Sequence, residues 1–526
     1  MLWRIESVTH EIRISDSDAT AGESRFVAFD SSTFVALTRF GMGAAPGEAD
    51  HVGSDPRGWL VEQLRPQPIP ATLAQLPGTA TLYDRFRAVQ AARKAAKLAE
   101  AKQQANPAAP PIAPPIAPVM PGDSASGRGA QLRRPGLPIQ PQAAAKLPVV
   151  ATPPAPQPMG DNLRDIYLTE LGARTRQAIT TTTPLQERLV QFWSNHFTVS
   201  VMRPPVLPIA GAFEREAIRP HVTGRFHDLL RAVAMHPAML LFLDNAQSIG
   251  PDSQAGRKRD RGLNENLARE MLELHTLGVD GGYTQADVTQ FARVLTGWTL
   301  DRAADGERGT FMFDPRVHEP GDKVLMGMSI RGGGQEEGEA MLAWLATHPA
   351  TAHHIATKLV RHFIADDPPH ATVDAVAATY RKTGGDLAAT MAAVIGRPEV
   401  WDPPLAKMRS PNDLVIATMR ALNQPGVEDK AILRSLSMLG QPPWTAPSPA
   451  GWPDKSDAWM GPEALMRRLQ WADIIARAAP HADPMQLADA TIGPVISGDT
   501  RGAMNGAANQ RERMVLWLAS REFERR

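Results

Sequence analysis

Hydrophobic side chains recur every three to four residues along most of the chain, which is the spacing of helices with one buried face. In the N-terminal part this pattern predicts helices within residues 31–50, 55–64 and 82–104. Pro56 suits the first turn of the second helix, because proline there leaves no intrahelical donor missing. Ala, Lys and Gln dominate the third segment, which predicts a long exposed helix.

Helix follows helix again from residue 161 to about 300 and from 338 to the end of the sequence. Thr284 with Asp287 three positions later predicts a capping box. The two His-Pro-Ala triplets, at 236–238 and 348–350, predict a histidine cap followed by a helix that starts at proline. Only residues 309–330 show a β pattern, which predicts a small hairpin. The predicted fold class is therefore all-α, a single large multi-helical unit with that hairpin.

One stretch breaks the helical pattern. Residues 107–158 contain 15 of the chain's 47 prolines, mixed with Ala and Gly. Proline removes backbone donors and disfavours helix in the preceding residue, so we expect a disordered Pro/Ala-rich insertion that loops out of the fold. The polar segment 1–30 is expected to be loosely ordered. Residues 31–106 then hold the N-terminal helices and residues 159–526 the main helical body.

Composition excludes several classes of function. Lys plus Arg equals Asp plus Glu at 56 each, which argues against nucleic acid as a partner. The chain has no cysteine, which excludes disulfides, thiolate nucleophiles and zinc–cysteine sites. No run of about 18 apolar residues predicts a membrane span. The sequence as given shows no signal peptide. HExxH, P-loop and Gly-x-Ser-x-Gly motifs are also missing from the sequence.

The densest group of polar residues falls in the predicted helix within 262–288. On an ideal helix Asn266, Glu270 and Glu273 share one face beside an apolar stripe, and His275 points to the opposite side. Such a face can bind a divalent cation, hold a general acid/base pair, or make hydrogen bonds and ion pairs to neighbouring helices. Carboxylate metal sites in helix bundles need a second carboxylate helix, so the cofactor stays unknown, with a divalent metal possible.

Histidine is unevenly distributed, with eleven of the 14 between His196 and His370, which suggests a polar centre. Asn195 and His196 follow an amphipathic helix, from which side chains can project into a cleft. His318 lies in a turn rich in Asp, Pro and Gly. Each histidine can supply a base or a ligand, or belong to ordinary loop chemistry.

Two further patterns concern ligands. His354, Lys358 and His362 are spaced at i, i+4 and i+8 on one predicted helix. This cationic stripe can hold an anionic ligand or pair with nearby carboxylates. Three tryptophans within residues 444–459 can form platforms for sugar rings, or can fix a Pro-rich loop onto the helices.

Taken together, these segments resemble the domain-of-unknown-function 1800 family. The resemblance rests on an ordered series of motifs from residue 31 to 526, among them FVALTRFGMGAAPGE, LQERLVQFWSNHFTVS, GLNENLAREMLELHTLGVDGGYTQADV, FDPRVHEPGDKVLMG and GWPDKSDAW. It implies one long helical unit but no established activity. It also implies an envelope or secreted setting and a sulfatase-like partner of the domain-of-unknown-function 1501 family, because members are often exported and encoded beside such proteins.

Two hypotheses follow, and whether the protein is an enzyme stays open between them. In the first, a hydrolase or transferase acts on glycan or envelope material, with Glu270 or Glu273 as acid/base or metal ligand and His196 and His318 assisting. The family motifs add the candidate ligand-binding residues Asn195, Asn245, Asn264, Asn266, His275, Trp298 and Lys358. In the second, the protein is a non-enzymatic scaffold or accessory protein for the sulfatase-like partner, and the polar helix is an internal hydrogen-bonded network.

Overall fold

A computed structural model describes residues 29–105, 162–258, 262–302, 308–402 and 404–526. The chain divides into two compact units. One comprises Met1–Arg87 together with Ala155–Arg526, and the other comprises Ala88–Pro154. Helix α5 (Thr79–Ala105) contributes residues to both units. The predictions for 1–30 and 107–158 fall almost wholly outside the described residues.

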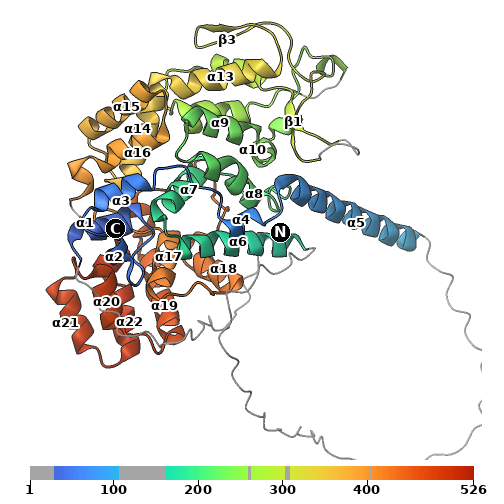
Figure 1. Cartoon of the computed structure of the whole chain (residues 1–526). Coiled ribbons are helices and arrows are strands. Elements are labelled where there is room, and N and C mark those ends of the chain that lie inside the picture. Colours follow the sequence, from blue (N-terminus) through green and yellow to red (C-terminus); the bar gives the residue numbers. More distant parts are fainter. Residues whose placement is uncertain (1–28, 106–161, 259–261, 303–307, 403) are drawn as a thin grey trace, which may run out of the picture. The chain divides into compact units, whose positions relative to one another are not determined.

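The all-α prediction is confirmed: within the described ranges, helices dominate and strands form only two short antiparallel pairs (Figure 1). Pro56 lies in the first turn of its helix as predicted, behind an Asp55 cap that accepts from the Gly58 amide at 2.9 Å. The N-terminal helices are α1 (Ser31–Val35), α2 (Glu48–Val52), α3 (Pro56–Glu62) and α4 (Ala71–Ala74).

The middle of the chain confirms the predicted caps. His236 Nδ1 accepts from the Ala238 amide at 3.1 Å and starts a helix at Pro237. Thr284 and Asp287 form the expected capping box. The helices here are α6 (Leu163–Thr180), α7 (Pro184–His196), α8 (Ala210–Phe213), α9 (Phe226–Met235), α10 (Pro237–Phe242), α11 (Asn266–Glu270) and α12 (Gln285–Val294).

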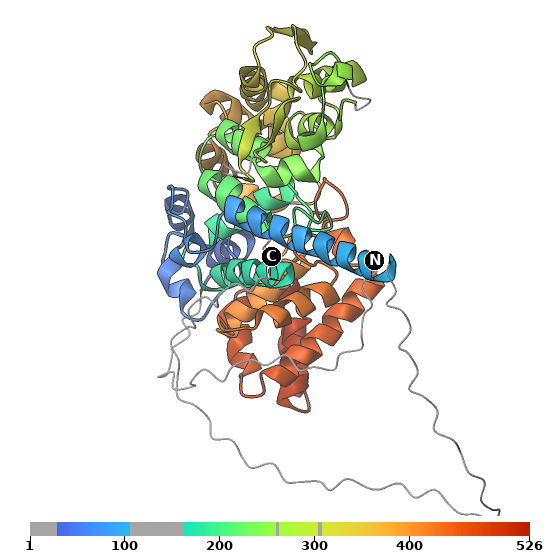
Figure 2. The same ribbon diagram turned by 90° about the vertical axis from the view of Figure 1, so that its right-hand side faces the viewer.

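Eleven α-helices follow within the described part of the C-terminal half. Helix α14 packs against α15, and α19 packs against α22. Helices α19–α22 gather on one side of α17 and α18 (Figures 1 and 2). They are α13 (Gln335–Thr347), α14 (Pro349–Phe363), α15 (His370–Thr383), α16 (Leu387–Ile395), α17 (Pro411–Ala421), α18 (Asp429–Met438), α19 (Pro462–Ala478), α20 (Pro484–Ile492), α21 (Gly498–Gly506), α22 (Gln510–Leu518) and α23 (Arg521–Glu524).

The β structure is arranged differently from the single hairpin expected within 309–330. Strand β1 (Trp298–Leu300) pairs with β2 (Phe311–Phe313), and β3 (Lys323–Leu325) pairs with β4 (Met328–Ile330). The Pro- and Gly-containing stretch between β2 and β3 cannot continue a ladder, so β2 pairs back with the strand that follows α12. The β3–β4 turn places Met326 and Gly327 at φ 46° and 78°, as a tight hairpin turn requires.

The polar helix of residues 262–288 is not a uniform α-helix. Helix α11 ends at Glu270, and Met271–Thr276 is a π-helical turn in which the Thr276 hydroxyl donates to the Met271 carbonyl at 2.6 Å. A π turn changes the angle between successive residues, so the assumed 100° spacing fails here. Two other π turns are Ala36–Phe40 and Glu214–Ile218.

Short 3₁₀ turns complete the fold, at Arg219–His221, Asn245–Gln247, Gly256–Lys258, Pro398–Val400 and Ser456–Trp459. The core that matters for the site forms where α7, α14 and α17 turn their apolar faces inward. Leu189 and Trp193 on α7, Leu359 on α14 and Val415 on α17 are almost completely buried. Polar side chains that flank these apolar faces are thereby brought around one common space.

Candidate functional site

A cavity of about 690 Å³ opens between α7, α14, the start of α17 and the segment 441–459, which joins α18 to α19. Its volume lies in the range of small-molecule binding sites. The segment 441–459 leaves its own helices and reaches the end of α7, where the Val201 amide donates to the Trp444 carbonyl at 2.8 Å (Figure 2).

Asn195, at the end of α7, holds the segment 441–459 in place through two hydrogen bonds. Its Nδ2 donates to the Trp452 carbonyl at 2.9 Å, and the Trp452 amide donates back to Oδ1 at 2.8 Å. Gly451 makes the approach possible, since its φ is 82° and any Cβ would overlap the Asn195 carbonyl oxygen. Asn195 therefore lies at the cavity, but both ends of its side-chain amide already have partners.

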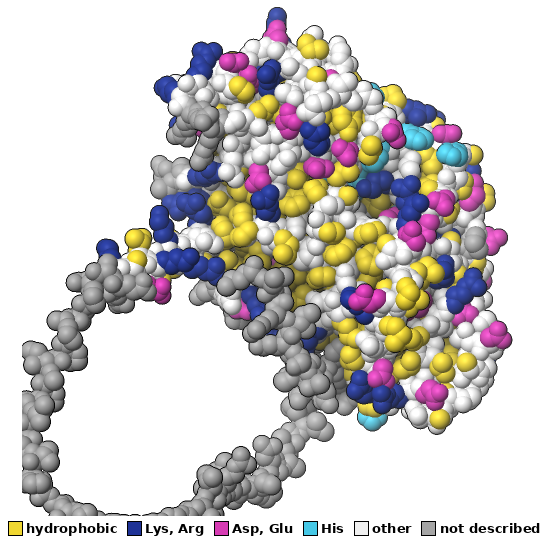
Figure 3. Space-filling model, turned by 180° about the vertical axis from the view of Figure 1, so that it is seen from behind, with side chains coloured by type: hydrophobic (Ala, Val, Ile, Leu, Met, Phe, Trp, Pro, Cys, Tyr) yellow, Lys and Arg dark blue, Asp and Glu magenta, His cyan; other side chains and the backbone are white. Residues whose placement is uncertain are grey.

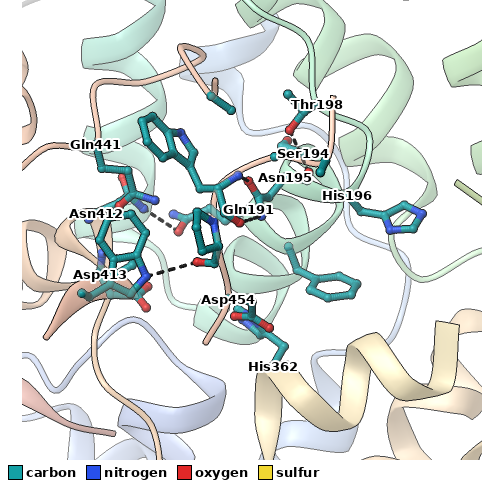
Figure 4. Close-up of a pocket in the computed structure, with 18 of the residues that line it drawn as sticks. Gln191, Ser194, Asn195, His196, Thr198, His362, Asn412, Asp413, Gln441 and Asp454 are labelled. Atoms are coloured by element: carbon teal, nitrogen blue, oxygen red, sulfur yellow. Dashed lines mark hydrogen bonds and ion pairs between the residues drawn. The ribbon is translucent and has the colours of Figure 1, made fainter. Parts of the chain in front are cut away.

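His362 on α14 and Asp454 in the segment form a hydrogen-bonded pair in the cavity wall (Figure 4). His362 Nδ1 donates to Asp454 Oδ1 at 2.9 Å, while the buried Nε2 has no hydrogen-bond partner in the described structure. Burial lowers the pKa of His362 more than Asp454 raises it. Burial raises the pKa of Asp454, but the charges and hydrogen bond of His362 and the charge of Lys407 bring it down to about 2. At neutral pH the pair is thus a neutral imidazole beside an ionised carboxylate.

A buried ion-pair cluster forms the floor of the cavity. Asp413 on α17 accepts from Arg188 Nη1 at 3.1 Å and lies 3.4 Å from Arg526 Nε. Although burial opposes ionisation, the positive charges of Arg188 and Arg526 hold the pKa of Asp413 well below its usual range. The hydroxyl of Ser410 caps α17 by accepting from the Asp413 amide at 3.2 Å. These ion pairs hold α7, α17 and Arg526 together and define the floor of the cavity.

Side-chain amides line another wall. Asn412 Nδ2 donates to Gln191 Oε1, and the Asn412 amide donates to Gln441 Oε1, both at 2.8 Å (Figure 4). The Nε2 of Gln191 is buried and has no partner among the described residues. An unpaired buried donor costs free energy, so this amide is available to a ligand that carries an acceptor.

His196 lies at the edge of the cavity, with its ring turned away from the other labelled side chains and toward His275 (Figure 4). Its Nε2 donates to the His275 carbonyl at 3.2 Å. Burial, reinforced by the charge of Lys358, lowers the pKa of His196 well below its ordinary value and that of His275 to about 3. The same two causes lower the pKa of His354 to about 4. These three imidazoles are neutral at physiological pH.

Of the eleven residues named from the sequence as catalytic or ligand-binding candidates, three line this cavity: Asn195, His196 and Lys358. The structure places the other eight outside its lining: Asn245, Asn264, Asn266, Glu270, Glu273, His275, Trp298 and His318. His275 stands directly behind His196, with ring centroids 6.1 Å apart, and is completely buried. The predicted residues are therefore divided between the cavity and other parts of the unit.

Glu270 and Glu273 are half-exposed and do not lie at the centre of the unit as the hypotheses assumed. Burial and the neighbouring Glu273 charge raise the pKa of Glu270. Glu273 accepts only a long hydrogen bond, 3.4 Å, from the Tyr283 hydroxyl. Among the residues that the structure describes, no group of three or more His, Asp or Glu side chains is arranged to hold a metal ion.

His318 belongs to a separate buried cluster. Its Nδ1 lies 2.7 Å from the Thr296 carbonyl and its Nε2 lies 3.1 Å from Glu337 Oε1. Lys323 Nζ pairs with Glu337 Oε2 at 2.7 Å, and both side chains are 2% exposed. Despite burial, hydrogen bonds from His318 and Lys323 lower the pKa of Glu337 to about 2. The cluster ties strand β3 to helix α13.

The remaining predicted residues have local roles. Asn245 Nδ2 donates to the carbonyls of Leu295 and Trp298, at 3.1 and 3.0 Å. Asn264 Oδ1 accepts from the Asn266 amide at 2.9 Å in the turn before α11. The buried Trp298 ring packs so closely on Gly338 of α13 that a Cβ there would overlap it.

Sequence reasoning missed the partner of His362. It placed His362 on a cationic stripe, without its contact to Asp454. The signal was present, since Asp454 lies in the motif GWPDKSDAW, but 92 residues separate the two side chains. The polar pair Asn412 and Asp413, in the motif PND at the start of α17, was also missed as part of the site.

The fold and the cavity define an all-helical protein with a polar pocket whose wall is a Trp- and Pro-rich segment. The chain belongs to the DUF1800 family, because the family model described as "Protein of unknown function (DUF1800)" matches residues 35–525. No curated protein and no solved structure matches the chain. Within the described ranges, no helix is both long and apolar enough to cross a membrane.

Proposed function

We propose that the protein binds a carbohydrate-sized ligand in this cavity and that the His362–Asp454 pair performs acid–base chemistry on it, in a reaction of the hydrolase or transferase type. The observation that carries the proposal is the state of His362. Asp454 fixes the proton on Nδ1, while Nε2, buried in the cavity wall, has no partner among the described residues. A buried acceptor without a partner is costly for a structural role and suits a general base.

The chemistry follows from the two protonation states. Neutral His362 uses the Nε2 lone pair to take a proton from a water molecule or from a hydroxyl group of the ligand. The charge of the resulting imidazolium is stabilised by the ionised Asp454, which also keeps the ring in place. The imidazolium can then return the proton to a leaving oxygen. A pair of this kind contributes roughly 10²–10⁴-fold to a reaction rate.

The lining supports a sugar as the ligand. Trp444 and Trp452 line the cavity and are half-buried. Tryptophan rings pack well against flat apolar surfaces such as one face of a sugar ring. The free Nε2 of Gln191 offers a hydrogen bond to a hydroxyl or ring oxygen. We propose glycan or envelope material as the source of the ligand.

The test is a panel of oligosaccharides, with conversion followed by mass spectrometry and binding by titration calorimetry. We expect the wild-type protein to bind and convert at least one member. In the variants His362→Asn and Asp454→Asn we expect conversion to fall about 100-fold or more, with binding changed only a few-fold. His353→Asn is the matched control, since His353 is an exposed histidine of the same helix. Its Nδ1 lies 3.9 Å from the carboxylate of Asp374, which is also exposed. Absence of any binding, or full activity of His362→Asn, would overturn the proposal.

A second proposal is an accessory role for a sulfatase-like partner. It is supported by apolar side chains that remain exposed at and just before helix α19: Met460, Leu465, Met466 and Leu469, each at least 40% exposed. Exposed hydrophobic side chains also gather on the face shown in Figure 3. Contiguous apolar surface of this kind is typical of interaction sites. Sedimentation of the purified pair tests it, and we expect Leu465→Glu with Leu469→Glu to abolish co-sedimentation if α19 is the interface.

A further inference from the structure

The cavity contains more positive than negative side chains. Six Lys and Arg residues and three Asp residues line it. Two of the six cations are neutralised from outside the cavity. Arg174 pairs with Glu214 at 2.7 Å, and Lys455 pairs with Asp367 at 3.0 Å. Arg188 and Arg526 share a single carboxylate, that of Asp413.

The last two cations, Lys358 and Arg361, have no carboxylate partner. Within the described ranges neither side chain forms an ion pair, and Arg361 donates only to the Asp366 backbone carbonyl, at 3.3 Å. The Asp366 carboxylate itself is occupied by Lys407. Lys358 and Arg361 are also three residues apart on α14, a spacing at which like charges lie side by side and repel.

Asp454 offsets this repulsion, because its charge raises the pKa of Lys358 more than the Arg361 charge lowers it. His196 and His354, its neighbours, are neutral and bring no negative charge. Within the described ranges Asp454 forms an ion pair with His362 but not with Lys358, on which it acts only at longer range. Burial lowers the pKa of Lys358 to about 8, so the ammonium form still predominates at neutral pH. Among the described residues, no carboxylate thus lies within ion-pair distance of Lys358, which is half-buried and lines the cavity.

We propose that Lys358 and Arg361 form an anion subsite, and that the ligand is an acidic sugar carrying a carboxylate or sulfate group. This inference rests on the proposed function, because it names the substrate class of the same cavity. Carboxylates and sulfates accept strong, charge-assisted hydrogen bonds from ammonium and guanidinium groups.

The position of the subsite also constrains the ligand. His362 follows Lys358 by four residues on α14, so the two side chains share one face of the helix, about 5–6 Å apart at Cβ. The negative group and the bond that reacts must therefore lie close together. We expect both to belong to the same sugar ring, with the ring held against the tryptophan-lined wall.

The experiment compares matched sugars that differ in charge. The probes are D-glucuronate and glucose 6-sulfate against D-glucose, and D-galacturonate against D-galactose, titrated into wild-type protein and its variants. We expect the charged member of a pair to bind roughly ten- to hundredfold more tightly, as a charged hydrogen bond implies. Lys358→Met and Arg361→Met should each remove most of that preference. Lys455→Met is the matched control, because Lys455 also lines the cavity but is already paired, and it should change the preference less than about twofold.

The outcomes separate this inference from the proposed function. Equal binding of neutral and charged sugars would overturn the anion subsite and leave the carbohydrate site standing. A charged-sugar preference that survives in Lys358→Met and Arg361→Met would likewise overturn the subsite. Failure of every sugar to bind would overturn both. Thermal unfolding of each variant is measured as well, so that a loss of binding is interpreted only for variants that are folded.

Discussion

Among the residues that the structure describes, two histidine–carboxylate pairs with a lysine nearby, one buried and one half-buried, differ in how completely they are satisfied. Around His318, both ring nitrogens, the Lys323 ammonium and the Glu337 carboxylate all contact one another or the backbone. Around His362, one ring nitrogen is hydrogen-bonded to Asp454 and the other is not, and Lys358 forms no ion pair in the described structure. Residue type alone does not distinguish the two sites, but their hydrogen bonding does.

The difference separates a structural cluster from the one to which we propose a function. A fully satisfied buried network fixes the packing of β3 on α13 and leaves nothing for a ligand. A partly satisfied network costs free energy unless something else completes it. Of these two clusters, only the partly satisfied one, around His362, lies beside the cavity. This is why we place the chemistry at His362 and not at His318.

The largest expected effect tests the structural cluster. Glu337→Gln removes the carboxylate and leaves Lys323 buried without a counter-ion. We expect the free energy of unfolding to fall by about 3–5 kcal/mol, the usual result of breaking a buried ion pair. Denaturant unfolding measures it. Glu339→Gln, on the same helix but in a more exposed pair with Arg231, should cost no more than about 1 kcal/mol. Equal losses in the two variants would contradict the structural role.

The next effect concerns the neutral histidines behind the cavity, and it depends on pH. Burial and the Lys358 charge lower the pKa of His275 from 6.5 to about 3 in the folded state. Below pH 6.5 the unfolded chain binds a proton at His275 and the folded chain does not. The free energy of unfolding therefore falls as the pH falls from 6.5 toward 3. By pH 4.5 this residue alone should cost roughly 3 kcal/mol.

His275→Phe removes that contribution, and unfolding measured at pH 7.5 and 4.5 shows it. The variant should lose less stability between the two pH values than the wild-type protein, whereas His353→Asn should behave like wild type. An unchanged pH dependence in His275→Phe would show that His275 titrates normally.

A smaller effect is expected where the segment 441–459 meets α7. Gly451→Ala puts a Cβ against the Asn195 carbonyl at a φ of 82°, which strains the backbone and should cost roughly 1–3 kcal/mol. We expect tryptophan fluorescence to shift to the red as Trp452 becomes more exposed, and sugar binding to be lost. Gly461→Ala, where no heavy atom lies within 4 Å of the added carbon, should do neither.

The smallest expected change in stability belongs to the functional cluster. Lys358→Met removes an unpaired cation next to Arg361, so the free energy of unfolding should change by about 0.5 kcal/mol or less, or rise slightly. Ligand binding should weaken in the same variant. The contrast with Glu337→Gln is the sharpest form of the comparison. A loss of several kcal/mol in Lys358→Met would mean that Lys358 is structural too.

Much of the fold was predictable because its signals are local. The capping box at Thr284 and the proline at the start of α3 each depend on a few neighbouring residues. The β pairing was not predictable in the same way, since β2 pairs with β1 across the intervening loop and not with β3. The π turn at Met271–Thr276 was not predicted either, because the helical pattern assumes a constant 100° per residue.

The site was only partly predictable. Asn195, His196 and Lys358 stand in family motifs and on helical faces, which sequence reasoning can recognise. Asp454 and Asp413 join them only through tertiary packing, and nothing in their local sequence indicates which helix they meet. Glu270 and Glu273 had the strongest local pattern, yet their faces turn toward solvent.

The walls of the cavity come from widely separated parts of the chain, and this has a consequence for the order of folding. Asn195 and Trp452, which join α7 to the closing segment, are 257 residues apart. Synthesis proceeds from the N-terminus, and contacts of such long range form late because the loop between them must first be ordered. A nascent chain that already contains His196 and His362 still lacks part of the proposed site until Asp454, in the cavity wall, and Arg526, in its floor, have been added. Under the proposed function, competence to bind therefore reports that the chain has been made and folded from α7 through Arg526.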